Sequence, residues 1–340
     1  MSAWLRYAVV ACIFAPFAAG AEPIKLKFAF FASDREYAYR TVVKPFADAV
    51  NLNSKGLVEI EVFPGGALGR SYREQAQMVL NGTVDIAWVN PSLTPELFPD
   101  NPSVELPGLF RNITEATRVH TRLASSDALR GYGDFFVIAA VATPPLKIHM
   151  RPPVASLADL RGKKIRTLNH TEGTVLKALG MVPEILPINR TAEAINRGTI
   201  DGATAPLAVL IDFGIARFTT YHYFLDLGAA PLLILMNRKT FDSLPKASQD
   251  VIRGYSGEWV ATRFIQATEA YDNPILEKLT SDPKRTAIYP SRSDLDVAHV
   301  AFKTVIEAWT AQDSRNRELL TLVQAQLAKL RSERDPPGQQ

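Results

Sequence analysis

Hydrophobic and polar positions follow one another in stretches that are typical of strands alternating with helices. Strand patterns are expected at residues 25–31, 58–63 and 84–89, with helical patterns at residues 41–50 and 72–81 between them. This succession predicts βαβ units in a largely parallel sheet, which places the protein in the α/β class.

A short repeat indicates that the chain has two similar halves. Residues 81–87 read NGTVDIA and residues 197–203 read RGTIDGA, so that Gly82 and Gly198 lie 198 − 82 = 116 positions apart. Each copy is expected to end a helix on a left-handed glycine and then to enter a short strand. One copy in each half is what two similar α/β lobes require.

Prolines and one very apolar run mark where the chain is expected to pass between the lobes. A strand pattern at residues 137–141 runs into prolines at 144–145 and 152–153, which predicts a crossover. The apolar run at residues 227–236 predicts a second crossover, on a strand covered on both faces. We expect these two segments to be hinge strands.

Two longer helical patterns follow in the last third of the chain. Residues 245–271 keep one apolar face, and the Asn-Pro pair at 273–274 is expected to kink or end this helix. Four apolar residues between positions 319 and 330 predict a further amphipathic helix.

The first 21 residues have the composition of an export signal. Arg6 is followed by residues 7–21 without a charge, and the run ends in the A-x-A-type sequence AGA. Because about 15 residues are too few to span a bilayer, residues 1–21 are predicted to be a cleavable signal peptide and the protein to be periplasmic. The alternative is a lipoprotein signal, in which Cys12 is lipidated.

The overall composition excludes several classes of protein. With 38 basic and 35 acidic residues, the chain has no excess of positive charge that favours nucleic acid. Cys12 is the single cysteine, which excludes a disulfide framework and a zinc–cysteine site. No cofactor and no metal are expected.

Common catalytic motifs of exported enzymes are missing from the sequence. The five histidines are scattered without an HExxH motif, and no GxSxG motif occurs. Residues 243–246 match S-x-x-K, but Pro245 is expected to start a helix between Ser243 and Lys246. We therefore expect a binding protein and not an enzyme. The alternative is an exported enzyme on the same scaffold that uses Ser243 or a histidine.

An ordered set of motifs resembles the substrate-binding proteins of TRAP transporters. The motifs span about residues 24–310 and lie at residues 25–31, 62–69 (VFPGGALG), 81–90, 159–167 (DLRGKKIRT), 200–202 (IDG) and 243–245 (SLP). The resemblance implies a two-lobe periplasmic binding protein of the Venus-flytrap type, with hinge strands and a long helix spanning both lobes. It also implies that lobe I comprises residues 22–142 plus 231–270, and lobe II residues 143–230 plus 271–335.

The resemblance further implies an extracytoplasmic receptor for organic acids. In this family, the ligand closes the lobes, and the closed form delivers it to TRAP membrane permease subunits. Whether the protein is a monomer or a dimer stays open. Two alternatives keep the architecture, namely a ligand-binding co-receptor for a sensor and the receptor of an ATP-driven importer.

The resemblance identifies Arg166 as the residue that binds the ligand carboxylate. A guanidinium presents two parallel donors that match the two carboxylate oxygens. The other candidate ligand-binding residues are Phe31, Trp88, Asn90, Asn169, Ile188 and Thr204. The alternative roles are a structural salt bridge for Arg166 and ordinary core packing for the apolar candidates.

Departures from the family pattern indicate the class of ligand. Polar positions of members that bind sugar acids look replaced here by the segment 143–147, by Ala205, and by Arg190 and Ala192. Because unmatched polar groups are costly to bury, a hydroxyl-rich ligand is expected to bind poorly. We therefore expect a monocarboxylate with an apolar or aromatic body.

Overall fold

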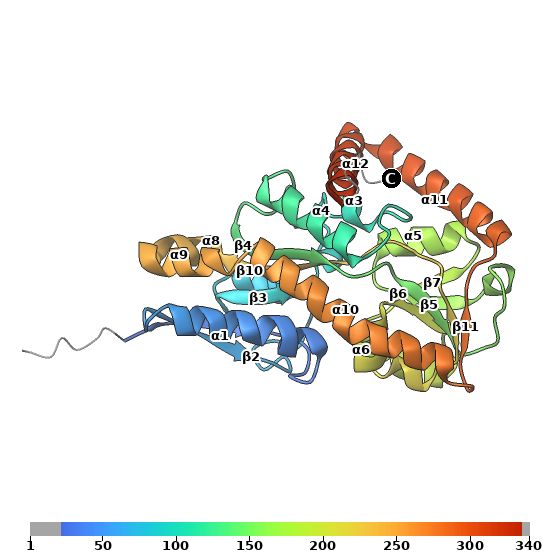
Figure 1. Ribbon diagram of the computed structural model, residues 1–340, viewed down its shortest axis with the longest axis horizontal. Coiled ribbons are helices and arrows are strands. Elements are labelled where there is room, and N and C mark those ends of the chain that lie inside the picture. Colours follow the sequence, from blue (N-terminus) through green and yellow to red (C-terminus); the bar gives the residue numbers. More distant parts are fainter. Residues whose placement is uncertain (1–21, 335–340) are drawn as a thin grey trace, which may run out of the picture.

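The computed structural model describes residues 22–334, and in this range the strands form two sheets, one in each lobe (Figure 1). In sheet order, lobe I contains β2 (Val58–Phe63), β1 (Ile24–Ala29), β3 (Ile86–Val89), β10 (Pro231–Asn237) and β4 (Phe135–Ala142). Lobe II contains β11 (Thr286–Ile288), β9 (Tyr221–Tyr223), β5 (Lys147–Met150), β8 (Gly202–Ala205), β6 (Lys164–Thr167) and β7 (Val182–Ile185). The predicted two-lobe α/β fold is confirmed. The predicted signal at residues 1–21, with Cys12, lies outside the described residues.

Each sheet contains an antiparallel strand that arrives from the other lobe. In lobe I, β10 pairs antiparallel with β3 and β4, whereas β1 pairs parallel with β2 and β3. In lobe II, β5 pairs antiparallel with β8 and β9. The chain passes from β4 to β5 and from β9 to β10, so both predicted crossovers are confirmed. The crossover strands make the sheets mixed rather than largely parallel.

Helices cover the faces of both sheets. Those of lobe I are η1 (Tyr39–Val43), α1 (Lys44–Asn53), α2 (Gln75–Leu80), η2 (Pro91–Leu93), α3 (Pro102–Glu105), α4 (Ile113–Ser125), α8 (Arg238–Ser243) and α9 (Lys246–Gly254). Those of lobe II are η3 (Ala158–Leu160), α5 (His170–Ala178), α6 (Ile188–Asn196), α7 (Leu207–Asp212) and η4 (Ile215–Arg217). Three long helices follow, α10 (Glu258–Ser281), α11 (Arg292–Gln312) and α12 (Ser314–Arg334). No helix in residues 22–334 is long and apolar enough to cross a membrane.

Helix α10 spans both lobes along one side of the molecule (Figure 1). Its first half packs Phe264 into the lobe I core, and its last turns pack Ile275 and Leu279 against lobe II. The expectation of one continuous helix over residues 245–271 is wrong, because the helix is interrupted between α9 and α10, where Gly257 has a φ of 60°. Pro274 does not end α10, since the apolar contacts beyond it hold the following turns in place.

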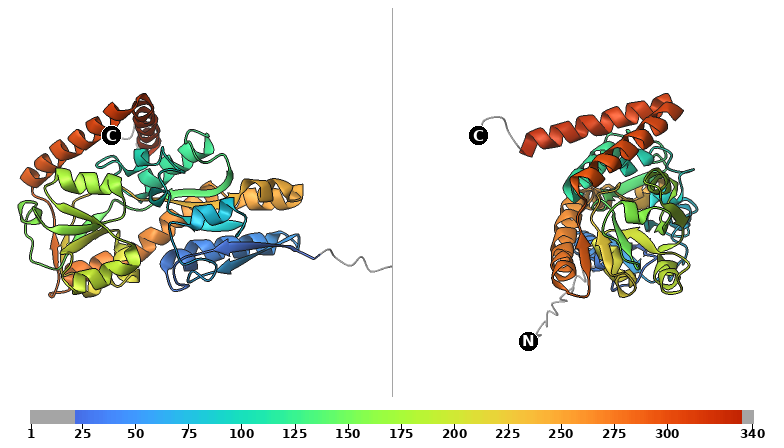
Figure 2. Two further views of the ribbon diagram at one scale, coloured as in Figure 1. Left: turned by 180° about the vertical axis from the view of Figure 1, so that it is seen from behind. Right: turned by 90° about the vertical axis from the view of Figure 1, so that its right-hand side faces the viewer.

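The two C-terminal helices divide between the lobes, which corrects the predicted lobe II range of 271–335. Helix α11 packs Phe302 and Val305 into the lobe II core. Helix α12 instead buries Leu319 and Val323 against lobe I, next to α4 (Figure 2). The amphipathic pattern predicted this helix but could not indicate which lobe offers the complementary apolar face.

The predicted repeat forms the same junction in both lobes. Gly82 and Gly198 have φ of 70° and 72°, as a left-handed end of a helix requires. In lobe I, the N–H of Lys27 donates to Asp85 Oδ2 at 2.7 Å. In lobe II, the N–H of Lys164 donates to Asp201 Oδ2, also at 2.7 Å. The aspartate in each copy thus ties its junction to the neighbouring strand.

Candidate functional site

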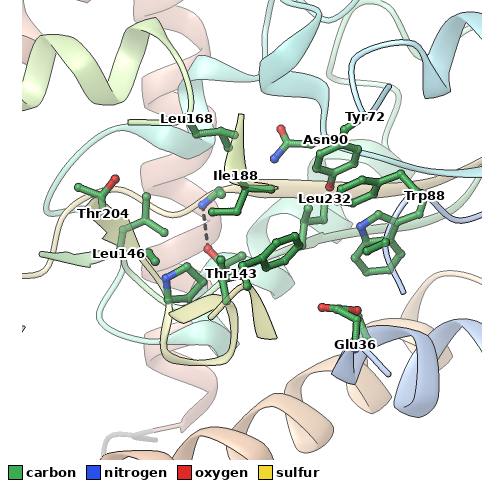
Figure 3. A pocket seen from close by; sticks show the side chains of 18 of the residues that line it. Glu36, Tyr72, Trp88, Asn90, Thr143, Leu146, Leu168, Ile188, Thr204 and Leu232 are labelled. Carbon is green, nitrogen blue, oxygen red and sulfur yellow. Dashed lines mark hydrogen bonds between the residues drawn. The ribbon is translucent and has the colours of Figure 1, made fainter. Parts of the chain in front are cut away.

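A cavity of about 100 Å³ lies between the lobes, where the carboxyl ends of central strands from both sheets meet (Figure 3). β1 and β3 deliver residues 30–32 and 88–90 from lobe I, and β6 and β8 deliver residues 166–168 and 204–206 from lobe II. Residues of the two crossovers, including Thr143 and Leu232, complete the wall. Strand ends at such a crevice are the usual ligand site of α/β folds.

Six of the seven predicted ligand-binding residues line this cavity. They are Phe31, Trp88, Asn90, Arg166, Ile188 and Thr204. Asn169 does not line it, because its side chain caps α5 by accepting the N–H of Glu172 at 2.9 Å. Asn169 instead lines a neighbouring cavity of about 10 Å³.

Arg166 is a buried cation, and only some of the hydrogen-bond donors of its guanidinium have partners within the described part of the chain. The residue belongs to β6, and only 3% of its surface is exposed. Nε donates to the carbonyl oxygen of Leu186 at 2.9 Å, and Nη1 reaches that of Thr204 at 3.5 Å. Nη2 is buried and has no hydrogen-bond partner within residues 22–334. An anion in the cavity would satisfy this donor.

The electrostatic state of Arg166 reflects its burial. Burial lowers the pKa of the guanidinium to about 10, and the nearby carboxylate of Glu172 opposes the shift. Glu172 is already occupied by other donors, since its Oε2 accepts the N–H of Leu168 at 2.7 Å and its Oε1 accepts the hydroxyl of Thr204. At neutral pH the cavity therefore holds a positive charge that lacks a dedicated partner.

An aromatic wall closes the cavity across the gap between the lobes. Phe31 of lobe I stacks on Tyr72 with ring centroids 3.6 Å apart and an interplanar angle of 9°. The same ring lies nearly parallel to Phe213 of lobe II at 6.4 Å. Trp88 adds an edge contact with Phe30 at 5.9 Å between ring centroids. Phe31 therefore has a role in both the wall and the contact between lobes.

Three acidic residues in or beside the site were missed by sequence reasoning, namely Glu36, Asp212 and Glu172, which is described above. Glu36 lines the cavity, and burial together with the nearby Asp212 raises its pKa to about 8. Asp212 of lobe II accepts the N–H of Tyr37 in lobe I at 3.1 Å and the hydroxyl of Tyr271 in α10 at 2.8 Å. Glu36 lies in the charged stretch SDREY, which reads as an exposed loop, so no pattern distinguishes it.

The S-x-x-K motif lies outside the cavity. Ser243 is exposed at the end of α8, where its hydroxyl donates to the carbonyl of Thr240 at 2.7 Å, and Lys246 pairs with Asp250. Pro245 is the N-cap of α9, so the predicted helix start between Ser243 and Lys246 is confirmed. Within residues 22–334, no group of three or more His, Cys, Asp or Glu side chains could hold a metal ion.

Curated proteins with similar sequences are named as solute-binding or periplasmic binding proteins. A solute-binding protein of Verminephrobacter eiseniae is 29% identical over 61% of this chain and 63% of its own length. The 2,3-diketo-L-gulonate-binding periplasmic protein YiaO of Escherichia coli is 27% identical over 67% of this chain and 70% of its own length. The chain thus spans a little under two thirds of the first of these relatives.

Solved structures match nearly the whole chain. A marine metagenome TRAP solute-binding protein specific for aromatic acids, in complex with 3-hydroxybenzoate, is 25% identical. The two structures superpose with a TM-score of 0.85, and the match covers 91% of the present chain and 99% of the metagenome protein. A TRAP solute-binding protein of Rhodoferax ferrireducens in complex with copurified benzoate is 26% identical. This structure superposes on the present one with a TM-score of 0.81, and the match covers 90% of the present chain and 98% of the Rhodoferax protein.

The family assignment rests on the match of a family profile to most of the chain. Residues 28–313 match DctP, described as the bacterial extracellular solute-binding protein, family 7. This range includes both lobes, the cavity and the repeat. The chain therefore belongs to family 7 of the bacterial extracellular solute-binding proteins, the solute-binding proteins of TRAP transporters.

Proposed function

We propose that this protein is a periplasmic receptor that binds an aromatic monocarboxylate and delivers it to the membrane subunits of a TRAP transporter. The observation that carries the proposal is a buried guanidinium inside an apolar cavity. Nη2 of Arg166 has no hydrogen-bond partner in the described part of the chain, and most of the lining side chains are apolar or aromatic. One carboxylate on an apolar body matches both features.

The size of the cavity favours a single ring. Its volume is about 100 Å³. An engineered apolar cavity of roughly 150 Å³ is known to accept benzene, so a volume of this order suits one six-membered ring better than a larger body. The two structural relatives that contain 3-hydroxybenzoate and benzoate support the same class of ligand.

The main competing ligand class is a sugar acid, which the Escherichia coli relative binds according to its name. The polar wall of the present cavity is poorly suited to many ligand hydroxyls. Thr143 Oγ1 already accepts the N–H of Ala230 at 3.0 Å, and Thr204 Oγ1 donates to the carbonyl of Arg166 at 3.1 Å. A polyhydroxylated ligand would give up hydrogen bonds to water without full replacement.

The proposed mechanism is closure of the lobes over the ligand. The cation of the cavity belongs to lobe II, and much of the aromatic wall belongs to lobe I. A ligand that contacts both walls stabilises the closed state relative to the open one, and the closed state is what the membrane subunits recognise.

A ligand screen by thermal shift and isothermal titration calorimetry tests the proposed class. Benzoate and 3-hydroxybenzoate are expected to raise the melting temperature and to bind, whereas galactonate and glucuronate are expected to do neither. Arg166→Ala should remove binding of benzoate, whereas Arg190→Ala, at an exposed arginine on α6, should not. Stabilisation by the sugar acids alone would contradict the proposal.

Delivery to a TRAP permease is tested separately. Vesicles that contain the permease subunits encoded with this protein should take up labelled benzoate when the receptor and an ion gradient are supplied. Uptake that instead requires ATP would favour the receptor of an ATP-driven importer. Binding without any uptake would favour the co-receptor of a sensor.

A further inference from the structure

The polar groups that line the cavity differ in whether they already have partners. The side chains of Thr143, Thr204 and Glu172 are engaged in hydrogen bonds within the protein. Asn90 accepts the N–H of Ser92 at 3.0 Å, and the Tyr72 hydroxyl is hydrogen-bonded to Trp88 and Asn90. Among the charged lining residues, Arg166 Nη2 has no hydrogen-bond partner within residues 22–334, and Glu36 uses one of its two carboxyl oxygens.

Glu36 keeps one carboxyl oxygen for the cavity. Its Oε2 accepts the backbone N–H groups of Ala38 at 2.9 Å and Tyr39 at 3.2 Å. Within residues 22–334, no hydrogen bond to Oε1 is found. Figure 3 shows the carboxyl group of Glu36 pointing toward the cavity, on a different side from Thr204, whose carbonyl Arg166 contacts. The backbone bonds fix the orientation of the group, so Oε1 is presented in one direction.

The surroundings of Glu36 favour its neutral form near pH 7. Burial and the adjacent Asp212 of α7 raise its pKa to about 8, while the N–H groups of Tyr39 and Ala38 and the charge of Arg40 in η1 oppose the shift. The phenols of Tyr37, Tyr72 and Tyr271 are the other titratable groups on which Glu36 acts electrostatically. A neutral carboxyl can both donate and accept a hydrogen bond.

We propose that Glu36 determines the specificity of the cavity at the ligand end remote from the carboxylate, where it favours a ring hydroxyl and, in its ionised form, rejects a second carboxylate. The inference rests on the proposed function, in which Arg166 holds the ligand carboxylate. A hydroxyl at the remote end exchanges its hydrogen bond with water for one with Oε1. A second carboxylate would lie against Glu36 and close to Asp212, with no cation of the cavity left to balance it.

The test compares three ligands that differ at one ring position. Benzoate carries hydrogen there, 3-hydroxybenzoate a hydroxyl, and isophthalate a carboxylate. By calorimetry near pH 7, the unaltered protein should bind 3-hydroxybenzoate more tightly than benzoate, by about threefold to tenfold for one hydrogen bond. Near pH 9, where Glu36 with its pKa of about 8 is ionised, it should bind isophthalate at least about tenfold more weakly than benzoate, because like charges are then brought together in a buried site.

The variant Glu36→Gln keeps the shape and the hydrogen-bonding capacity but cannot carry a negative charge. Near pH 9, its discrimination against isophthalate, measured relative to benzoate, should be about tenfold smaller than that of the unaltered protein, and near pH 7 the two proteins should differ little. Asp34→Asn is the matched control, because it removes a charge two residues away on an exposed side chain that does not line the cavity. Its ligand ratios should equal those of the unaltered protein.

The outcomes separate this inference from the proposed function. Benzoate binding with equal isophthalate ratios near pH 9 in the unaltered protein and in Glu36→Gln would overturn the role of Glu36 alone. Equally tight binding of isophthalate and benzoate by the unaltered protein near pH 9 would do the same without any variant. Absence of benzoate binding by the unaltered protein would overturn both.

Discussion

Lobe I and lobe II end their central strands at the cavity in the same way, yet they bring different side chains to it. The junctions at Gly82 and Gly198 match in backbone conformation, and each carries an aspartate bonded to the next strand. Beyond the junctions, lobe II supplies the cation Arg166, whereas lobe I supplies Trp88 and the acid Glu36. The scaffold is repeated but the chemistry is divided between the lobes, so the proposed ligand depends on side chains from both of them.

The largest expected effect comes from removing the lobe II half of this chemistry. Arg166→Met should weaken benzoate binding by about 2–3 kcal/mol or more, which is the scale of a charged bidentate contact. The free energy of unfolding of the unliganded protein should not fall, because the substitution removes a buried charge whose Nη2 has no hydrogen-bond partner within residues 22–334.

Calorimetry and urea denaturation of the same variant measure the two quantities. Loss of stability in parallel with loss of binding would indicate that Arg166 has a structural role in lobe II. Arg190→Met, at an exposed position of the same lobe, serves as the control for the substitution itself.

The second prediction concerns a feature of lobe I that lobe II lacks, its attachment to α12. Asp100 of lobe I is fully buried at its side chain and pairs with Arg315 of α12 at 2.9 Å and with Arg130 at 2.7 Å. Burial alone would raise the pKa of Asp100, but the bonds from these two arginines outweigh it and lower the pKa. Arg315→Ala should reduce the free energy of unfolding by about 2–3 kcal/mol.

Urea denaturation checks this value against Arg317→Ala, an exposed arginine two positions along α12. Benzoate affinity should stay unchanged in both variants, because neither residue lines the cavity. Equal stability of the two variants would show that Arg130 alone is sufficient to hold Asp100.

The sequence predicted local structure better than partners in space. The repeat, the crossover strands and the α12 helix follow from short patterns and were confirmed. The prediction of the lobe on which α12 packs was wrong. Asp100 and Arg315, which join α12 to lobe I, are 215 positions apart, and no periodicity of the sequence links them. Pro274 was expected to kink or end its helix, but apolar contacts of Ile275 and Leu279 with lobe II favour its continuation.

The same distinction holds for the site. Arg166 and five other candidates were brought to one cavity because each lies at, or shortly after, the carboxyl end of a strand. Asn169 was misplaced, since an asparagine before a helix serves equally well as an N-cap. Glu36 was missed because its burial depends on Asp212 and on the aromatic wall, which come from distant parts of the chain.

The third prediction compares the buried histidines of the two lobes. His120 of lobe I bonds to the carbonyl of Val141, and burial lowers its pKa to about 4. In lobe II, His149 and His222 bond to each other at 2.9 Å, and burial lowers their pKa values to about 3 and about 4. Because the unfolded histidines bind protons near pH 6.5 and the folded ones do not, stability is full above that pH and falls below it.

Each histidine should lower the free energy of unfolding by about 1–2 kcal/mol between roughly pH 6.5 and pH 5. Urea denaturation across this range measures the slope. Replacing the lobe I residue by His120→Gln should make the fall shallower, and replacing one of the lobe II pair by His222→Gln should do the same. A slope that neither variant changes would assign the acid sensitivity to other groups.

The smallest effect tests the shared part of the scaffold. Gly82→Ala and Gly198→Ala place a side chain at φ of 70° and 72°, where a Cβ meets open space in lobe I and only Arg151 at 3.7 Å in lobe II. Left-handed strain of about 1–2 kcal/mol, less the 0.4–1 kcal/mol gained by restricting the unfolded chain, predicts about 1 kcal/mol of destabilisation at each site. Gly133→Ala is the control, because its backbone is not left-handed and no atom lies within 4 Å of the added Cβ. Equal losses for the two junction variants in urea denaturation, with none for the control, are expected if the lobes repeat one backbone design; clearly unequal losses would show that the two junctions share a sequence pattern but not its energetic role.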